Sequence, residues 1–258
     1  METLQLDRAD GVATITLDRP SVKNAMNAAL WDELSAVLDE IARTPTDRVV
    51  VIAGAGGDFC SGADLGGGGP FSGPEHAGFV MARINEVPLK LHRLPRPTIA
   101  KVRGVAAGAG LNLALGCDLV VASDNARFSE IFARRGLVLD FGGSWLLPRL
   151  IGLHRAKEVA FFADVLSATE ADRLGLVNRV VPDDELDATV EGWARRLAAG
   201  PPVALAQIKR MLNESFQRSM ADALDAEGNA QLLAVATDDV KEAVKAFLAK
   251  REPHFEGR

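Results

Sequence analysis

Two short stretches of the chain combine small residues with an apolar run, a composition that suits close contact between backbone and ligand. They are residues 59–65, FCSGADL, and residues 104–118, GVAAGAGLNLALGCD. Glycine turns at the end of an apolar run let the main chain approach a bound molecule closely. Backbone N–H groups held in a dry site stabilise a negative oxygen better than water does. The two stretches therefore predict a pair of main-chain donors directed at one carbonyl oxygen.

A single carboxylate stands in a third stretch, residues 136–143, GLVLDFGG. The apolar residues that flank this carboxylate, Asp140, are Leu137, Val138, Leu139 and Phe141. Apolar neighbours desolvate a carboxylate, so we expect the pKa of Asp140 to be raised toward the pH at which a general base works. The alternative is that Asp140 caps a helix beginning near Gly142, because aspartate is favoured at that position.

The composition is that of a globular protein with a sizeable core. Its 258 residues are 48% hydrophobic and 25% charged, with a formal net charge of −6. An acidic chain without a basic run argues against a nucleic-acid partner. The most apolar window, residues 105–121, contains Asn112 and Asp118 and is shorter than the roughly 20 residues that span a bilayer, so we expect no membrane insertion.

The N-terminus and the cysteines predict a cytoplasmic location. The first residues, METLQLDRADG, lack a cationic start followed by an apolar stretch, so they indicate a strand and not a signal peptide. Cys60 and Cys117 have neither metal-ligand nor redox spacing, so we expect two reduced thiols and no metal site.

Apolar periodicity predicts strands that alternate with helices over the first 150 residues. Alternating residues around Asp10-Gly11 indicate a β-hairpin, and the apolar run 49–53 indicates a buried strand. Helical spacing follows Asn27 and recurs over 79–94 and 110–115, with strands at 98–102 and 119–122. The class is therefore α/β. The Gly-rich residues 66–74 predict a loop, which one interpretation makes a flexible lid.

After about residue 151 the pattern becomes almost entirely helical. We expect helices at 158–163, 170–174, 185–199, 203–216, 221–235 and 240–249, with one short strand at 177–181. Amphipathic helices appended to a complete core need a surface on which to bury one face. The chain is therefore predicted to form a homo-oligomer, with residues 1–195 as the core and 196–258 as the helical region of self-association.

Six ordered motifs together resemble the enoyl-CoA hydratase/isomerase family, also called the crotonase superfamily. They are residues 18–27 (DRPSVKNAMN), 59–65, 97–104 (PTIAKVRG), 108–118, 142–149 (GGSWLLPR) and 168–178 (ATEADRLGLVN). The resemblance implies a crotonase-like spiral of stacked β-β-α turns, a homotrimer or a hexamer of two trimers, and an acyl-CoA thioester substrate. It implies no cofactor, since coenzyme A is part of the substrate.

By match of motif, the resemblance assigns roles to particular residues. The two main-chain donors fall on Ala63 and Ala109, and the second of these leads into a helix whose positive end adds to the effect. The positions at which hydratases of this family carry two glutamates hold Asn112 and Phe132, neither of which can exchange a proton. The further positions expected to border the substrate are Lys23, Ala25, Asp64, Leu65, Gly108 and Trp145, although Asp64 also suits a turn and Trp145 a core position.

Three functions remain open on this resemblance. Asp140 matches a catalytic aspartate of non-hydratase members, so a double-bond isomerase that converts a 3-enoyl-CoA into a 2-enoyl-CoA is the first hypothesis. The second is a hydratase in which Glu130, two residues before Phe132, is brought inward by a change of register. The third is a non-catalytic protein that binds acyl-CoA in the retained thioester pocket.

Overall fold

The main sheet of the computed structural model, which describes residues 1–66 and 75–258, has six strands in the order β1-β2-β3-β4-β6-β9. β1 and β2 form an antiparallel hairpin, and the other neighbouring strands pair in parallel. The strands are β1 (Leu4–Ala9), β2 (Val12–Leu17), β3 (Val49–Gly54), β4 (Thr98–Val102), β6 (Leu119–Ser123) and β9 (Arg179–Val181). Most of the Gly-rich segment for which a lid was considered lies outside the described residues.

A second, smaller sheet contains β5 (Val105–Ala107), β7 (Arg127–Ser129) and β8 (Leu166–Ser167), in the order β5-β7-β8. Two isolated parallel bridges extend it beyond β5, from Ala106 to Cys60 and from Ala63 to Met26. Each of β2, β3, β4 and β6 is thus followed along the chain by a short stretch in this second sheet. The chain winds through both sheets in successive turns, which confirms the predicted α/β spiral and places equivalent points of neighbouring turns side by side.

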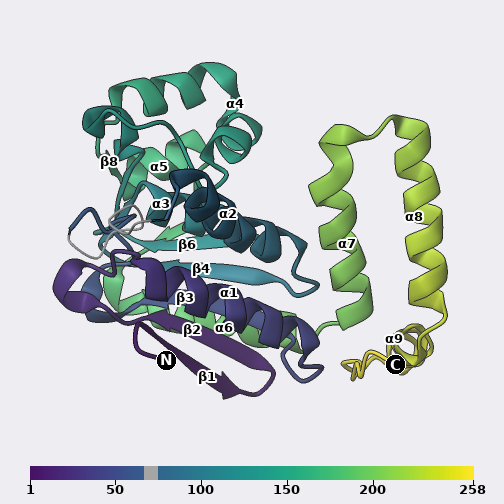
Figure 1. The fold of residues 1–258 in the computed structure, drawn as a ribbon. Coiled ribbons are helices and arrows are strands. Elements are labelled where there is room, and N and C mark those ends of the chain that lie inside the picture. The colour runs from purple at the N-terminus through teal and green to yellow at the C-terminus, as the bar shows by residue number, and fades with distance from the viewer. Residues whose placement is uncertain (67–74) are drawn as a thin grey trace.

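Nine α-helices lie in the described part of the chain; the earlier ones pack around the sheets, and α7, α8 and α9 stand to one side of them (Figure 1). They are α1 (Ala28–Arg43), α2 (Ala77–Arg93), α3 (Ala109–Leu115), α4 (Gly143–Phe162), α5 (Ala168–Leu174), α6 (Leu186–Ala198), α7 (Pro202–Glu214), α8 (Met220–Val235) and α9 (Asp238–Ala249).

Local sequence signals explain the first elements. The β1-β2 turn places Asp10 and Gly11 at positive φ, as a two-residue hairpin turn requires. The side chain of Asn27 accepts a hydrogen bond from the N–H of Leu30 at 3.0 Å and so caps α1. The predicted apolar stripe of this helix, from Leu30 to Ile41, is buried.

The main sheet is buried on both faces. Along β3, Val50 and Ile52 belong to the cluster under α1 and α2, while Val49 and Val51 face α6 on the other side. This double burial explains why β3 is a continuous apolar run instead of an alternating one. The last helix of the core, α6, extends to Ala198, so the boundary expected at residue 195 falls inside it.

Two predictions of local structure were wrong. α4 begins at Gly143, near the start considered for a helix capped by Asp140 but fifteen residues before the helix expected at 158–163, and it includes Pro148 and a break at Gly152, where φ is +75°. These two residues hide the helical pattern from sequence analysis. The three-residue strands β5 and β7 were also missed, because three residues are too few to show alternation.

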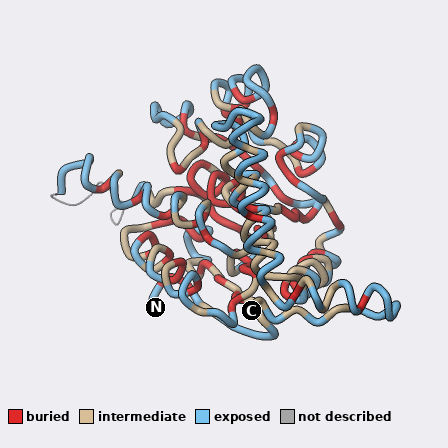
Figure 2. Tube along the Cα trace, turned by 90° about the vertical axis from the view of Figure 1, so that its right-hand side faces the viewer, coloured by how far each residue is buried: buried red, intermediate tan, exposed pale blue. Residues whose placement is uncertain are grey.

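The C-terminal helices α7 and α8 form an antiparallel pair beside the core (Figure 1). Figure 2 looks onto this side and shows exposed residues along much of the helical surface in front. Large apolar side chains are exposed on α7, on α8, on the turn between them and on α9: Leu212, Phe216, Met220, Leu224, Leu232 and Phe247. Within the described residues, no helix is both long enough and apolar enough to cross a membrane.

Candidate active site

The two stretches predicted to carry main-chain donors lie side by side. The N–H of Cys60 donates to the carbonyl of Val105, and the N–H of Ala107 donates to the carbonyl of Cys60, both at 2.9 Å. These bonds join one turn of the spiral to the next. A Cβ added to Gly62 would lie 3.6 Å from the main-chain nitrogen of Ala109. The Gly62–Ala63 peptide is therefore beside the N-terminus of α3.

Hydrogen bonds on either side of Ala63 fix the direction of its N–H. The N–H of Met26 donates to the carbonyl of Gly62 at 2.8 Å, and the N–H of Asp64 donates to the carbonyl of Met26 at 2.9 Å. In this parallel arrangement the N–H of the residue between them points to the opposite side, where Ala109 lies. Ala109 is the first residue of α3, so its own N–H has no acceptor within the helix. The structure brings the two predicted donors together.

Close approach of α3 to residues 59–65 depends on Gly110. A Cβ at this position would lie 2.7 Å from Cβ of Cys60 and 2.8 Å from its carbonyl carbon, closer than atoms in contact allow. The Cys60 thiol donates to the carbonyl of Asn24 at 3.1 Å, and burial raises its pKa to about 12. Cys60 is therefore a packing residue beneath the site and not a nucleophile.

Asp140 lies between the turn at residues 131–135 and α4, with one carboxylate oxygen buried. That oxygen, Oδ1, has no hydrogen-bond partner among the described residues. The N-cap of α4 is Gly142, and no side chain caps this helix, so the capping interpretation of Asp140 was wrong. Burial raises the pKa of Asp140 to about 6, as expected. A buried, unpaired carboxylate of this kind suits a general base.

The cause of that burial differs from the prediction. Val138 is 84% exposed and Leu137 is 49% exposed, so neither shields Asp140 as the sequence suggested. Phe141 is buried, and its ring packs on Trp31 of α1 with ring centres 5.2 Å apart. The Asp140 carboxylate is therefore shielded from water by tertiary packing, and not by every apolar residue next to it in the sequence.

The two positions that match the glutamates of hydratases are both buried. The Nδ2 group of Asn112 donates to the main-chain carbonyl of Asp140 at 3.0 Å and to Oε2 of Glu130 at 3.4 Å. The ring of Phe132 lies against Gly108, with Cζ 3.6 Å from the position that a Cβ on this glycine would take. Phe132 thus forms an apolar wall next to the residue that precedes the Ala109 donor.

Glu130 is fully buried, although the sequence suggested that a change of register would be needed to bring it inward. It directly follows β7, whose Ser129 pairs in register with Ala107 of β5. Burial is the main cause that raises its pKa to about 8; the Asn112 hydrogen bond lowers it and the charge of Asp140 raises it. Its burial becomes visible only with the strand pairing, because Glu130 directly follows β7, a three-residue strand that local periodicity does not reveal.

Two of the predicted substrate-binding residues support the donor loop. Arg19 forms an ion pair with Asp64 at 3.0 Å, and its guanidinium also donates to the carbonyl of Ala25. Asp64 accepts the N–H of Gly66 at 2.9 Å; this bond first, and Arg19 next, lower its pKa. Asp64 therefore holds the turn that carries Ala63, whatever else it touches.

Lys23 and Leu65 lie at the surface. Lys23 is at positive φ, and its ammonium group lies 3.6 Å from a carboxylate oxygen of Asp58. Leu65 is 65% exposed directly after the donor loop. Both are accessible to a bound molecule from the outside of the protein.

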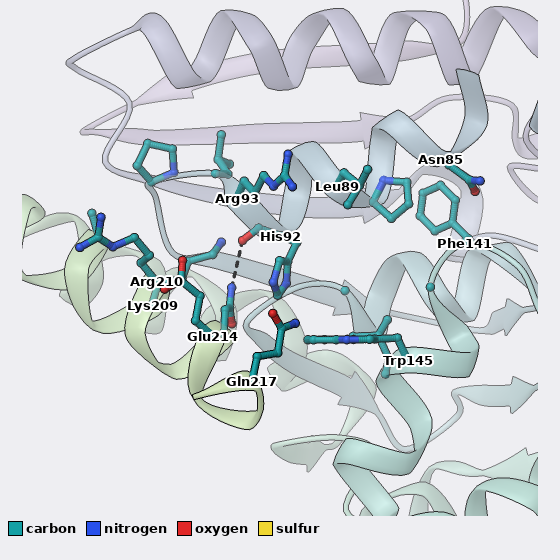
Figure 3. A pocket seen from close by; sticks show the side chains of 18 of the residues that line it. Asn85, Leu89, His92, Arg93, Phe141, Trp145, Lys209, Arg210, Glu214 and Gln217 are labelled. Carbon is teal, nitrogen blue, oxygen red and sulfur yellow. Dashed lines mark hydrogen bonds between the residues drawn. The ribbon is translucent and has the colours of Figure 1, made fainter. Parts of the chain in front are cut away.

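Trp145 lines a cavity of about 780 Å³ between α2, the start of α4 and α7. Figure 3 shows side chains of these helices around it, among them His92 of α2 and Trp145 of α4, together with Gln217 of the turn that follows α7. The ring of His92 meets the Trp145 ring edge-on at 5.1 Å between ring centres, and burial lowers the pKa of His92. Among the described residues, the lining includes Phe141 but not Asp140, Ala63 or Ala109. The cavity therefore begins next to the candidate base without containing it.

No group of three or more histidine, cysteine, aspartate or glutamate side chains in residues 1–66 and 75–258 is placed to hold a metal ion. The site consists of two main-chain donors, two buried carboxyl groups and one amide. Such an arrangement can stabilise a negative oxygen and move protons beside it.

Comparison with known proteins agrees with this chemistry. The sequence profile of the enoyl-CoA hydratase/isomerase family matches residues 7–258. A protein of Rhodobacter capsulatus named "Probable enoyl-CoA hydratase" is 40% identical over 256 residues, covering 99% of this chain and 98% of its own. The 1,2-epoxyphenylacetyl-CoA isomerase of Escherichia coli K12 is 40% identical over 251 residues, covering 96% of each chain.

The crystal structure of an enoyl-CoA hydratase from Bacillus anthracis superposes with a TM-score of 0.95 at 32% identity, covering 100% of both chains. The fold and the site thus define an enzyme of the crotonase superfamily. More narrowly, the chain belongs to the enoyl-CoA hydratase/isomerase family.

Proposed function

We propose that this enzyme moves the double bond of a 3-enoyl-CoA thioester to the 2-position. The observation that carries the proposal is the buried carboxylate oxygen of Asp140, which has no partner among the described residues. Asp140 is joined through its main-chain carbonyl to Asn112 of α3, the helix that begins with the proposed donor Ala109. The relative from E. coli is by name an isomerase of a CoA thioester, which supports isomerisation on this scaffold.

The reaction needs one base and one oxyanion site. The thioester oxygen accepts hydrogen bonds from the N–H groups of Ala63 and Ala109, which makes the protons on carbon 2 more acidic. Asp140 removes one of these protons, and the electron pair of the C2–H bond forms a double bond between carbons 1 and 2 while the carbonyl pair moves onto the thioester oxygen, which gives a dienolate conjugated with the 3,4-double bond. Asp140 then returns the proton to carbon 4, and the double bond is left between carbons 2 and 3. Nothing is added or lost, so one carboxylate serves both transfers.

Hydration through two glutamates is disfavoured by the side chains at those positions. Asn112 has no titratable group, and Phe132 has no polar group with which to hold a water molecule. The apolar ring instead excludes water from the edge of the site, which favours return of the same proton over addition of solvent.

Glu130 gives a second candidate, hydration of a 2-enoyl-CoA. The observation in its favour is that the carboxyl group is already inside the protein, bonded to Asn112 at 3.4 Å. Its complete burial opposes a role in activating water, since a base must reach the water that it deprotonates.

The two candidates are separated by two substrates and two variants. The isomerase converts a 3-enoyl-CoA, which is followed as a gain in absorbance of the conjugated thioester, and Asp140→Asn abolishes that gain. The hydratase consumes crotonyl-CoA, which is followed as a loss of the same absorbance, and Glu130→Gln abolishes that loss. Crotonyl-CoA hydration that needs Glu130, with no turnover of the 3-enoyl substrate, would overturn the isomerase proposal.

The proposal extends to the rest of the substrate and to assembly. Lys23, Ala25 and Leu65 border the coenzyme A portion, and the cavity at Trp145 accepts the distal part of the acyl chain. The exposed apolar side chains of α7–α9 support a homotrimer or hexamer in which they are covered. The free, buried thiols of Cys60 and Cys117 are consistent with a cytoplasmic location. Coenzyme A is part of the proposed substrate, so the proposal includes no cofactor.

A further inference from the structure

Two buried polar side chains, Asn112 and Glu130, form a cluster with the half-buried candidate base Asp140 that contains more hydrogen-bond acceptors than donors. Asn112 supplies two N–H groups, which go to the carbonyl of Asp140 and to Oε2 of Glu130. Three buried oxygens in this cluster have no partner among the described residues: Oδ1 of Asn112, Oε1 of Glu130 and Oδ1 of Asp140. A buried acceptor without a donor costs about 1–3 kcal/mol, so a proton on one of the two carboxyl groups would stabilise this cluster.

The orientation of the Asn112 amide identifies where the missing proton belongs. Nδ2 must face Asp140 and Glu130, because the amide oxygen in its place would meet two other oxygens. The amide is held there by packing, since a Cβ added to Gly143 would lie 2.5 Å from Nδ2 and 2.8 Å from Oδ1. Oδ1 therefore needs a donor that does not come from Asn112 itself. A protonated carboxyl group can accept from an amide N–H and donate to an amide oxygen at the same time.

We propose that Glu130 is held as a neutral carboxylic acid whose proton orients Asn112 and thereby positions Asp140 for proton transfer. Glu130 is fully buried and so does not touch the substrate itself; it is a positioning residue. The proposal rests on the proposed isomerase function for its effect on rate, but not for the protonation itself.

The charges around Glu130 favour this state. Burial penalises the ionised form, and Asp140 is the one charged group whose field acts appreciably on the Glu130 carboxyl among the described residues. Asp140 is negative, so it opposes a second negative charge nearby. From α3 the neighbouring polar group is the neutral amide of Asn112. The following turn contains two cations: Arg134 is paired with Asp164 at the surface, and Arg135 is exposed. The pKa of Glu130, raised to about 8, agrees with a proton held at neutral pH.

Two variants separate a proton-donating role from simple filling of space. Glu130→Gln replaces the acid by an amide that can make the same two hydrogen bonds at any pH. Glu130→Leu keeps the volume but can donate nothing to Asn112. In the wild type, activity requires Asp140 ionised above about pH 6 and Glu130 protonated below about pH 8, so kcat/KM against pH is bell-shaped.

For Glu130→Gln we expect turnover at pH 7 within about threefold of the wild type. Its kcat/KM should still fall at low pH, but it should no longer fall at high pH. For Glu130→Leu we expect kcat to fall by about tenfold or more with a smaller change in KM, since the base is displaced. An alkaline limb that persists in Glu130→Gln overturns the proposal. So does loss of turnover in Glu130→Gln at pH 7, which would make Glu130 a proton-transfer group.

A second measurement does not depend on activity. A proton that Glu130 keeps in the folded state and loses in the unfolded state makes the wild type less stable as pH rises from about 4.5 to about 8. The melting temperature of Glu130→Gln relative to the wild type should therefore increase over this interval and then level off. The matched control, Glu227→Gln on the exposed face of α8, should show no such trend. The infrared difference spectrum of wild type minus Glu130→Gln at pH 7 should contain the carbonyl stretch of a protonated carboxyl.

The two measurements fail separately. If the stability difference between Glu130→Gln and the wild type depends on pH but the protein does not isomerise 3-enoyl-CoA, the proposed function is wrong and the assignment of Glu130 as a neutral acid stands. Isomerase activity with no stability difference and no protonated-carboxyl band would sink the assignment of Glu130.

Discussion

Replacing Gly110 by alanine tests whether the spacing of the two main-chain donors determines catalysis. The added Cβ would meet backbone and Cβ atoms of Cys60 at 2.7–2.8 Å, and none of these atoms can rotate away. To reach ordinary van der Waals contact, α3 must retreat from residues 59–65 by about 1 Å, which separates the N–H of Ala109 from that of Ala63. A misplacement of about 1 Å costs on the order of 10²-fold in rate. We therefore expect kcat to fall by about that factor in Gly110→Ala, with coenzyme A binding largely retained.

The assay is initial-rate isomerisation of a 3-enoyl-CoA, with the folded state checked by circular dichroism and thermal unfolding. The matched control is Gly192→Ala, the same chemical change inside α6, where nothing lies within 4 Å of the added Cβ. That control should keep full activity and gain up to about 1 kcal/mol of stability from the higher helix propensity of alanine. A folded Gly110→Ala enzyme with unchanged kcat would refute the argument that donor spacing is set by this contact. If Gly110→Ala does not fold, Ala109→Pro gives the same test by another route.

Ala109→Pro removes one donor at the first position of a helix, where proline is tolerated, and should lower kcat by about 10²–10³-fold; unchanged turnover would exclude this N–H from the reaction. Asp140→Asn should lower isomerisation by about 10²-fold or more. Because the raised pKa of Asp140 makes the wild type lose stability between about pH 4 and pH 6, Asp140→Asn should also unfold at a higher temperature than the wild type at pH 7 but not at pH 4. Lys209, buried on α7, bonds Asp118 at 2.8 Å and the carbonyl of Arg96 at 3.0 Å, so Lys209→Met should cost about 3 kcal/mol in urea unfolding; no loss would mean that this ion pair does not hold α7 to the core.

Sequence could predict those elements in which a turn, a cap or an apolar periodicity along the chain matches the way the element packs in the folded protein. The β1-β2 hairpin follows from Asp10-Gly11, and α1 follows from the Asn27 cap and its apolar stripe. β5 and β7 could not be predicted, because each consists of three residues whose strand character comes from pairing with neighbouring turns. Pairing between turns is not encoded in local periodicity.

The candidate site was predictable in its backbone and less so in its side chains. The small residues of both loops marked the donors, and the structure brings Ala63 and Ala109 together. The burial of Glu130 was missed because it depends on which residue of β7 faces α3, a matter of register that a three-residue strand does not reveal. The exposure of Val138 shows the reverse error, in which an apolar sequence neighbour was taken for a spatial one.

The stacking of turns in the spiral has a consequence for how such enzymes diversify. Successive turns contribute positions to the reaction centre, and the main-chain bonds that align neighbouring turns involve none of the side chains at those positions. A substitution at one of these positions can therefore replace a proton donor by an apolar side chain, while the two main-chain N–H groups still bind the substrate oxygen. Such positions are occupied here by Phe132, Glu130 and Asn112. A new reaction can therefore arise in this fold through replacement of these side chains, without a change in the backbone.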